Sequence, residues 1–230
     1  MDEFKVPIYL MTGFLESGKT SFLNFTLAQE YFQIDEPTLL ILCEEGEEEY
    51  DKKVLKKSRT SVEVIDSIEE LTTERLVAYD AFYNPGRVII EYNGMWQVSK
   101  LEELTFPSGW GIEQHIVTVD ASTFQVYLNN MKSLFMEMVR NADLVLFNRA
   151  DTELPLANFR RSIKVVNPGA ELIFEDEEGE IEDIFDGEMP FDVKAETIEI
   201  PNEDYGIWYL DARDHADTYN GKKFLLPEWC

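Results

Sequence analysis

Short apolar runs recur along most of the chain, separated by stretches in which apolar residues return at helical spacing. Runs of this length that are rich in Val, Ile and Leu are typical of strands buried on both faces, as in a parallel sheet. They occupy residues 6–11, 38–43, 87–91, 115–120, 142–147 and 171–174, and an alternating segment at 61–66 predicts one more strand. Strands that alternate with helices predict an α/β fold, with a mainly parallel, twisted sheet and helices on both faces.

Helical spacing fills most of the intervals between these strands. Residues 67–70 (SIEE) resemble a capping box, which predicts a helix from there to about Tyr83, where residues 84–86 (NPG) end it. After the strand at 115–120 the apolar periodicity continues to about Asn141 and predicts one long helix. A helix near 156–165 precedes the last strand of the sheet.

The composition shifts sharply after this last predicted helix. Residues 171–199 contain 13 acidic residues and a single basic one, Lys194. A charge run of this kind is typical of a solvent-exposed linker. We therefore expect one main domain at 1–175, an acidic linker at 176–195 and a small C-terminal segment at 196–230, which we interpret as an incomplete second domain. Its aromatic stretch at 205–210 (YGIWYL) predicts burial.

Charge and composition exclude several classes of protein. The 230 residues include 20 Lys and Arg against 46 Asp and Glu, a net charge of −26. Such a surface repels phosphate backbones, so nucleic-acid binding is not expected. No run approaches the roughly 18 apolar residues of a membrane span, and the N-terminus lacks the basic and apolar pattern of a signal peptide. Cys43 and Cys230 give no disulfide framework. We expect a cytoplasmic protein.

The first strand is followed by a phosphate-binding motif. Residues 13–20 (GFLESGKT) fit G-x-x-x-x-G-K-[ST], the P-loop motif, between a predicted strand and a predicted helix. Glycines at both ends of such a loop let backbone N–H groups point at a phosphate, where the helix dipole also favours negative charge. In this motif Lys19 neutralises the β/γ-phosphates, and the Thr20 hydroxyl can bind Mg²⁺. The motif predicts that the chain binds a nucleoside phosphate.

Carboxylates follow two other predicted strands. Glu91 ends the run at 87–91, which is the position of the Mg²⁺-binding acid in P-loop proteins, and Gly94 nearby would let a backbone N–H approach a γ-phosphate. The strand at 38–43 opens into residues 44–51 (EEGEEEYD), which hold six acids and which we call the acidic loop. Because loops after parallel strands form the ligand crevice, Glu44 is our candidate both for a metal contact and for positioning the attacking water. A solvated acidic face is the alternative interpretation of this loop.

Residues 148–151 (NRAD) follow the strand at 142–147 and are similar to the N-K-x-D motif with which GTPases read guanine. In that motif Asp151 would accept hydrogen bonds from the base, Asn148 would hold the loop and the base edge, and the residue at 149 would lie across the ring. Arg149 stands where the motif has Lys, and a planar guanidinium can stack on a purine.

With these residues placed, the sequence resembles the CobW family of P-loop GTPases, relatives of UreG and HypB, over about residues 6–174. The resemblance rests on six motifs in order: P-V-x-x-x-T-G-F-L-G-x-G-K-T-T at 7–21, N-E-F-G-x-x-x-x-D at 43–51, E-T-T-G at 91–94, V-D-A at 119–121, N-K-x-D at 148–151 and N-P-x-A at 167–170. The family's metal-binding C-x-C-C has no counterpart, since residues 61–67 contain no cysteine. Glu16 stands where the family has a small residue.

The resemblance implies a P-loop NTPase fold that binds GTP or GDP with Mg²⁺ and hydrolyses GTP slowly. It implies catalytic roles for Lys19, Glu91 and Glu44 and a metal site at Thr20, Glu91 and Glu44. The nucleotide-binding residues that it implies are Gly13, Glu16, Ser17, Gly18, Lys19, Thr20, Ser21, Gly94, Asn148, Arg149, Asp151 and Asn167. A protein partner, a metalloprotein or a transporter component, is implied by the switch role, and a homodimer by analogy with related GTPases.

Three functions fit these residues. The leading hypothesis is a slow GTPase that switches a partner's binding, in metal homeostasis by family resemblance. The second is a GTP-gated carrier that holds a second divalent metal with carboxylates of the acidic loop (Glu44, Glu47 and Glu49) in place of thiolates. The third is an ATP-dependent small-molecule kinase, against which residues 148–151 argue.

Overall fold

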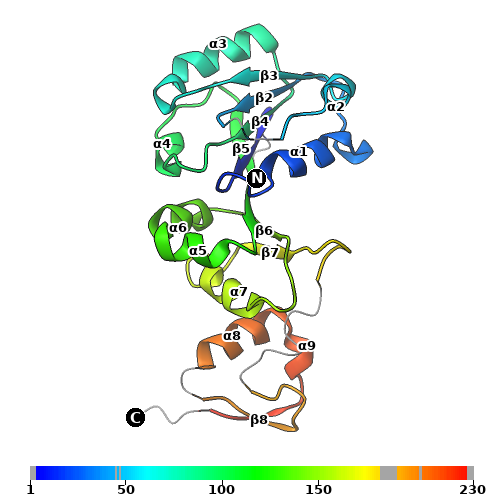
Figure 1. The fold of residues 1–230 in the computed structure, drawn as a ribbon, viewed down its shortest axis with the longest axis vertical. Helices are drawn as coiled ribbons and strands as arrows, with labels where there is room; N and C mark the ends of the chain where they lie inside the picture. Colours follow the sequence, from blue (N-terminus) through cyan, green and yellow to red (C-terminus); the bar gives the residue numbers. More distant parts are fainter. Residues whose placement is uncertain (1–3, 45, 47, 182–190, 202–203, 227–230) are drawn as a thin grey trace.

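The protein is built around one parallel sheet. The computed structural model describes residues 4–44, 46, 48–181, 191–201 and 204–226. Seven strands pair in parallel in the order β3-β2-β4-β1-β5-β6-β7, so the α/β fold expected from the apolar runs is confirmed (Figure 1). The strands are β1 (Val6–Thr12), β2 (Thr38–Leu42), β3 (Thr60–Val64), β4 (Arg87–Glu91), β5 (Trp110–Asp120), β6 (Leu144–Asn148) and β7 (Glu171–Phe174).

Helices cover both faces of the sheet, but unequally. Alternate strand residues pack with α1 and α2 on one face, and the remaining ones pack with α3 to α7 on the other (Figure 1). We call the first the α1 face. The helices are α1 (Lys19–Ala28), α2 (Lys52–Lys57), α3 (Thr73–Tyr83), α4 (Val98–Glu102), α5 (Phe124–Asn130), α6 (Lys132–Arg140) and α7 (Leu156–Lys164).

The helix predicted from residues 67–70 begins later than expected. Residues 68–70 form a single 3-10 turn, η2 (Ile68–Glu70), and the Ser67 side chain caps nothing. Thr72 is the true N-cap of α3, because its hydroxyl accepts a hydrogen bond from the Arg75 N–H at 3.2 Å. The capping-box pattern therefore marked the wrong turn, and the prediction of a helix from 67 is corrected.

The long helix predicted to run to about Asn141 is two helices. α5 ends at Asn130 and α6 begins at Lys132, with Met131 between them in a non-helical conformation (φ −131°, ψ 30°). The apolar periodicity continues across this break because both helices pack into the same cluster, with Phe124 from α5 and Phe135 from α6. Periodicity alone does not reveal such a break.

The C-terminal part forms a small βαβ unit with its own apolar cluster. β8 (Thr197–Glu199) pairs in parallel with β9 (Lys223–Leu225), and α8 (Tyr205–Asp214) and α9 (Ala216–Tyr219) connect them. The cluster reaches back to Phe191, inside the segment expected to be a linker. Residues 182–190 of that segment lie outside the described residues. In the described part of the chain, no helix is both long enough and apolar enough to span a membrane.

The candidate functional residues lie at one edge of the sheet. Because all seven strands run in parallel, the loops after β1, β2, β4 and β6 meet at the carboxyl edge, where ligands bind in folds of this type. The P-loop, the acidic loop, Glu91 and residues 148–151 all follow these strands. Four segments far apart in sequence are therefore brought to one place.

Candidate functional site

The P-loop wraps tightly at both of its glycines. Gly13 and Gly18 have φ of 140° and 94°, which L side chains rarely adopt. A Cβ on Gly13 would lie 2.4 Å from the Thr118 carbonyl oxygen, and one on Gly18 would lie 2.5 Å from Nδ2 of Asn148. α1 starts directly at Lys19 with no side-chain cap, so its first N–H groups are available to an anion.

Lys19 is buried, with an exposed fraction of 4%, and reaches back over the loop. Its Nζ donates to the carbonyl oxygens of Gly13 at 2.9 Å and Phe14 at 3.0 Å. The third contact of Nζ is a carboxylate oxygen of Glu44 at 2.6 Å. The cation expected to bind phosphate is therefore held by an acid that follows β2, as the strand order predicts for loops at the same edge.

Glu91 lies beside Thr20 at the end of β4. The Thr20 hydroxyl donates to Oε1 of Glu91 at 3.0 Å, and the Tyr50 hydroxyl donates to Oε2. Burial raises the pKa of the Glu91 carboxyl, although the hydrogen bond from Tyr50 and the nearby charge of Lys19 act in the opposite direction. A hydroxyl and a carboxylate placed together offer two hard oxygen ligands, the kind that Mg²⁺ prefers.

A cavity of about 210 Å³ opens between these groups. It brings together most of the residues predicted to bind nucleotide or metal. The lining residues are Leu15, Glu16, Gly18, Lys19, Thr20, Ser21, Glu44, Gly46, Glu48, Glu91 and Arg149.

The acidic loop is tied to α1 across the mouth of this cavity. The Ser21 hydroxyl donates to the Glu48 carboxylate, and the Asn24 side chain donates to the Glu49 carbonyl oxygen at 3.2 Å. Oδ1 of Asn24 in turn accepts from the Asp51 N–H at 3.0 Å. Glu47, proposed from the sequence as a metal ligand, lies outside the described residues.

Residues 148–151 contact the P-loop directly. Nδ2 of Asn148 donates to the Ser17 carbonyl oxygen at 2.7 Å, whereas its buried Oδ1 has no hydrogen-bond partner among the described residues. Arg149 (φ 50°) donates through Nη2 to the Glu16 carbonyl oxygen at 2.6 Å and through Nε to Asp120 at 2.9 Å. These bonds hold the guanidinium over the P-loop.

Besides Gly13, Ser17 and Asn148, three further predicted residues lie outside the cavity lining. Asp151 is exposed, and one of its carboxylate oxygens accepts from the Glu153 N–H at 2.9 Å. Gly94 packs on the P-loop, where a Cβ would lie 2.3 Å from the Gly13 carbonyl oxygen. Asn167 is remote: its amide bonds the carbonyl oxygens of Val139 and Ala142 and the N–H groups of residues 169 and 170, so it braces the turn before β7.

The structure adds residues that the sequence did not single out. Tyr50 holds Glu91, and Asp120 holds Arg149. Thr118 bonds the Ser17 hydroxyl at 2.8 Å and so supports the P-loop from β5. Only Asp120 carried a usable signal, because it ends a predicted strand within the V-D-A motif.

Within the described ranges no group of three or more His, Cys, Asp and Glu side chains is arranged to hold a metal ion. Cys43 is buried, and burial raises the pKa of its thiol to about 12, with a smaller contribution from Glu91. A thiol with this pKa is protonated at neutral pH and is a poor metal ligand.

Taken together, the fold and the cavity define a P-loop nucleotide-binding protein. Residues 7–174 match the family model of the CobW/HypB/UreG nucleotide-binding domain. The chain belongs to this family, and the resemblance found in its motifs is confirmed.

Solved structures share the fold. The hydrogenase maturation factor HypB from Archaeoglobus fulgidus is 18% identical with a TM-score of 0.50, over 75% of this chain and 82% of that chain. The Zn(II)-bound YjiA GTPase from E. coli is 20% identical with a TM-score of 0.55, over 77% of this chain and 59% of that chain. The chain thus spans less than two thirds of YjiA. A search of curated proteins found no match.

Proposed function

We propose that this protein binds GTP and GDP with Mg²⁺ at the P-loop, hydrolyses GTP slowly, and uses the nucleotide state to switch the binding of a protein partner. The observation that carries the proposal is the convergence of Lys19, Thr20, Glu44 and Glu91 on one cavity at the start of α1. Groups from three strand-end loops meet there, in positions that suit a polyphosphate and its cation.

The phosphate end uses Lys19 and the open N–H groups of α1. A triphosphate competes with the Glu44 carboxylate for Nζ of Lys19, since both are anions at the same donor. Binding therefore releases Glu44 from Lys19. This exchange couples the nucleotide to the acidic loop, which is the basis of the proposed switch.

Thr20 and Glu91 fit a Mg²⁺ site, because a hydroxyl and a carboxylate oxygen already lie 3.0 Å apart beside the P-loop. Bound Mg²⁺ would neutralise charge on the phosphates. Tyr50 keeps the second carboxylate oxygen of Glu91 oriented. Glu44 is the third residue that we assign to the cation site.

In the hydrolytic step a water oxygen forms a bond to the γ-phosphorus, and the bond from that phosphorus to the bridging oxygen breaks, giving GDP and inorganic phosphate. Lys19 and the P-loop N–H groups stabilise the charge of the transferring group. Glu44, once released from Lys19, is our candidate for orienting the water.

The base end uses residues 148–151. Asp151 is exposed and accepts from the guanine N1–H and amine, and Arg149 lies over the P-loop on the nucleotide side. The unpaired Oδ1 of Asn148 is a further acceptor at this end. Gly94 and Ser17 shape the loop.

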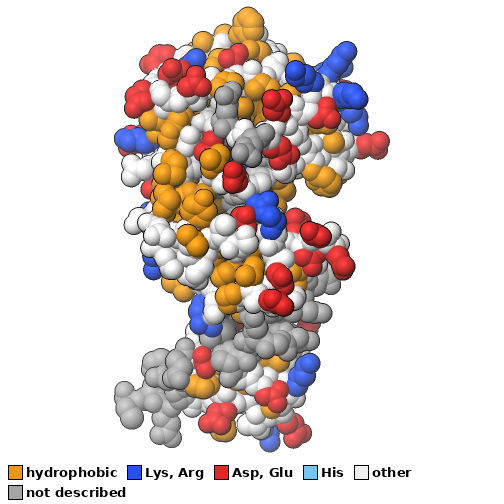
Figure 2. Space-filling model, in the orientation of Figure 1, with side chains coloured by type: hydrophobic (Ala, Val, Ile, Leu, Met, Phe, Trp, Pro, Cys, Tyr) orange, Lys and Arg blue, Asp and Glu red, His pale blue; other side chains and the backbone are white. Residues whose placement is uncertain are grey.

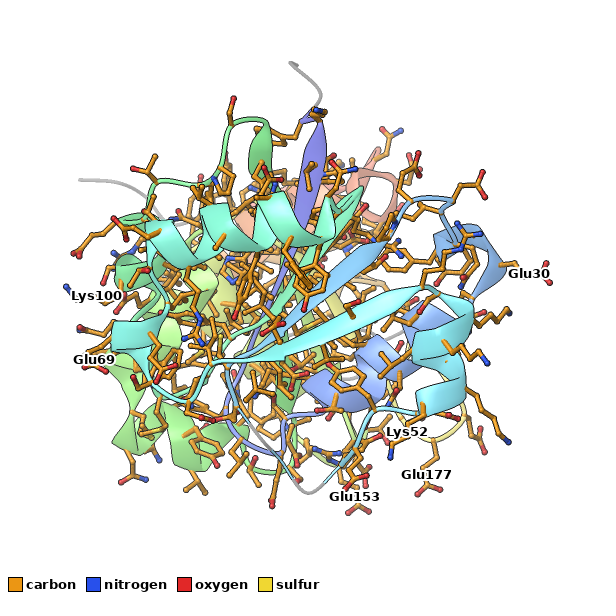
Figure 3. The ribbon with its side chains drawn as sticks, turned by 90° about the horizontal axis from the view of Figure 1, so that it is seen from above. Glu30, Lys52, Glu69, Lys100, Glu153 and Glu177 are labelled. Atoms are coloured by element: carbon orange, nitrogen blue, oxygen red, sulfur yellow. The ribbon has the colours of Figure 1, made fainter. Side chains whose placement is uncertain are left out.

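The test is fluorescent GDP and GTP binding with Mg²⁺, with ATP as competitor. Lys19→Ala should abolish binding, whereas Lys52→Ala, an exposed lysine of α2, should leave it unchanged (Figure 3). Asp151→Asn keeps an acceptor for the Glu153 N–H but removes the negative charge that would accept from guanine. It should therefore weaken GTP binding and leave ATP binding unchanged. Unchanged GTP affinity in Lys19→Ala would overturn the proposal.

A GTP-gated metal carrier is the second candidate. The one observation in its favour is that YjiA, which has the same fold, is a Zn(II)-bound GTPase. For this chain the ligands would be carboxylates of the acidic loop, with Zn²⁺ as cargo. Nucleotide-dependent binding of one Zn²⁺ that Glu44→Gln removes would support it, and binding indifferent to nucleotide would contradict it. If ATP displaces the guanine nucleotides in the competition assay, the leading hypothesis becomes an ATP-dependent small-molecule kinase, in place of both the switch and the metal carrier.

A further inference from the structure

The described helices leave part of the α1 face of the sheet uncovered. β5, β6 and β7 follow one another in the same direction across the sheet, and right-handed crossovers place α5, α6 and α7 on the opposite face. The connection from β1 to β2 runs the other way, so α1 lies on the α1 face next to β1. In the described ranges no helix follows α1 on this face beyond β1.

An apolar groove of about 330 Å³ lies at this position, and we call it the α1 groove. One wall is α1 with the 3-10 turn η1 (Glu30–Phe32), and the floor is formed by β1, β5 and the start of β6. The side chains are mostly aromatic and aliphatic. The lining residues are Tyr9, Leu10, Met11, Phe22, Leu23, Thr26, Tyr31, Phe32, Gln114, Ile116 and Leu144.

Apolar surface continues from the groove onto its outer rim. Tyr31 is 78% exposed and Phe25 is 63% exposed, both on the α1 side. Large aromatic side chains exposed next to an apolar groove are typical of protein interaction sites. Sheets of this class have helices on both faces, so the shape that fits beside α1 is another helix.

The charges around the groove select the kind of helix. Glu30 is exposed and directly precedes the lining residue Tyr31. Glu171 is exposed too and pairs in register with Leu144 on the groove floor. Figure 3 shows Glu30 at the outer edge of the molecule on the α1 side.

More acids follow β7. Residues 175–178 and 180 are all acidic, and the segment that carries them extends toward the side on which α1 lies (Figure 1). Figure 2 shows Asp and Glu side chains gathered in that region.

The basic residues near the α1 groove do not cancel the negative charge at its rim. Arg87 is buried behind the Phe32 ring, 3.9 Å from its centroid, and donates to Phe32 and Thr38. The lysines of α2 lie on the far side of α1, over β3. The rim that a ligand meets is therefore acidic.

We propose that the α1 groove docks an amphipathic helix of a partner protein, with an apolar stripe that enters the groove and Lys or Arg on its flanks. Burial of the stripe supplies affinity, and the acidic rim selects the basic flanks and speeds their approach. The α1 groove is a separate cavity from the nucleotide site: the two share no lining residue, although α1 borders both.

The test is a selection of displayed 20-residue peptides against the full chain. The library keeps apolar residues at helical spacing and varies all other positions among Lys, Glu, Gln and Ser. We expect the selected peptides to carry more Lys than Glu and to bind with micromolar affinity. Selection of neutral or Glu-rich peptides, or of none, would overturn the proposal.

Two sets of variants locate the binding. Thr26→Arg places a long cation inside the groove and should weaken the selected peptides at least tenfold, whereas Val77→Arg, at an exposed position on the opposite face, should not. Glu30→Lys with Glu171→Lys should weaken Lys-rich peptides about tenfold and leave their Gln-substituted versions unchanged. Unaltered thermal unfolding of each variant shows that the fold is kept.

Two further outcomes would contradict the proposal. The selected peptides could bind Thr26→Arg as well as the unchanged chain, which would place them elsewhere. Alternatively, the chain could sediment as a dimer that Thr26→Arg dissociates, in which case a second copy of the chain covers the groove.

Discussion

Lys19 and Glu44 are joined across the P-loop by a contact of 2.6 Å between Nζ and a carboxylate oxygen, and both side chains are almost completely buried. The Glu44 carboxylate is thus paired with the Lys19 ammonium group, on which phosphate binding depends. A buried ion pair of this kind is costly to break on one side only. The nucleotide and Glu44 are therefore competitors, and this competition can be measured.

Glu44→Gln removes the competing charge while it keeps the shape of the side chain. We expect GDP affinity to rise by roughly tenfold, because a charge-assisted hydrogen bond worth about 1.5–3 kcal/mol no longer opposes phosphate binding. GTP turnover should fall, since Glu44 is the proposed residue that orients water. Equilibrium GDP binding without Mg²⁺, which keeps the proposed cation role of Glu44 out of the measurement, and single-turnover GTP hydrolysis with Mg²⁺ measure the two effects. Glu69→Gln, at an exposed position on η2, is the matched control (Figure 3). Weaker GDP binding in Glu44→Gln would contradict the competition.

The Mg²⁺ dependence of nucleotide binding should vary with pH through Glu91. Burial raises the pKa of this carboxyl above its usual value of 4.5, so the folded protein holds the proton more tightly than the unfolded chain does. This group's contribution to stability is present at low pH and is lost as pH rises through the raised pKa. Mg²⁺ needs the carboxylate, so its effect on GDP affinity should grow over the same range.

Two variants test whether Glu91 and its hydrogen bond from Tyr50 cause this pH dependence. Glu91→Gln should flatten the curve of Mg²⁺-dependent GDP affinity against pH. Tyr50→Phe removes a hydrogen bond that lowers the pKa of Glu91, so it should move the curve to higher pH. A Tyr50→Phe curve that stays in place or moves to lower pH would show that Tyr50 does not hold Glu91.

Gly94→Ala tests the packing of the β4 loop on the P-loop. The added Cβ would meet backbone atoms of Gly13 and Phe14 at 2.3–3.0 Å, and backbone cannot give way as a side chain can. We expect a loss of about 1–3 kcal/mol of stability and weaker nucleotide binding. Gly206→Ala, in α8 with nothing near its Cβ, should be neutral or stabilising. Equal unfolding midpoints for the two variants would contradict the close approach.

His115 should make the protein acid-sensitive. Burial lowers the pKa of its imidazole to about 4, and Nε2 lies 2.9 Å from the Thr12 hydroxyl. A lowered pKa means that this stability is present above the unfolded value of about 6.5 and is lost as pH falls toward 4. Between pH 7 and pH 5 the loss from this group is about 2 kcal/mol.

Urea unfolding at the two pH values measures this loss. His115→Gln keeps a polar partner for Thr12 but cannot take up a proton, so it should lose less stability on acidification than the unchanged chain. Equal losses in both proteins would show that other groups cause the acid sensitivity.

Most of the fold could be predicted from the sequence because its signals are local. Apolar runs with Val, Ile and Leu read as buried strands wherever they lie, and the structure forms β1, β2 and β4 to β7 at those positions. Helix ends depend on single turns, so the sequence patterns predicted them less well. α3 begins at Thr73 and not at 67, and Met131 divides the helix predicted to reach Asn141.

The candidate site divides in the same way. The chain by itself determined the P-loop and the acid at the end of β4, because the residue types and their spacing along the chain are what that chemistry requires. It could not show that Tyr50 holds Glu91, that Arg149 reaches the Glu16 carbonyl oxygen 133 residues away, or that Asn167 lies apart from the cavity.

These contacts, like the α1 groove, depend on which strands are neighbours. Strand order is set by packing between distant segments, and no local periodicity records it. The sequence thus determined the strands, most of the helices and the phosphate-binding P-loop. Only the tertiary structure decided which side chains meet and which face of the sheet stays open.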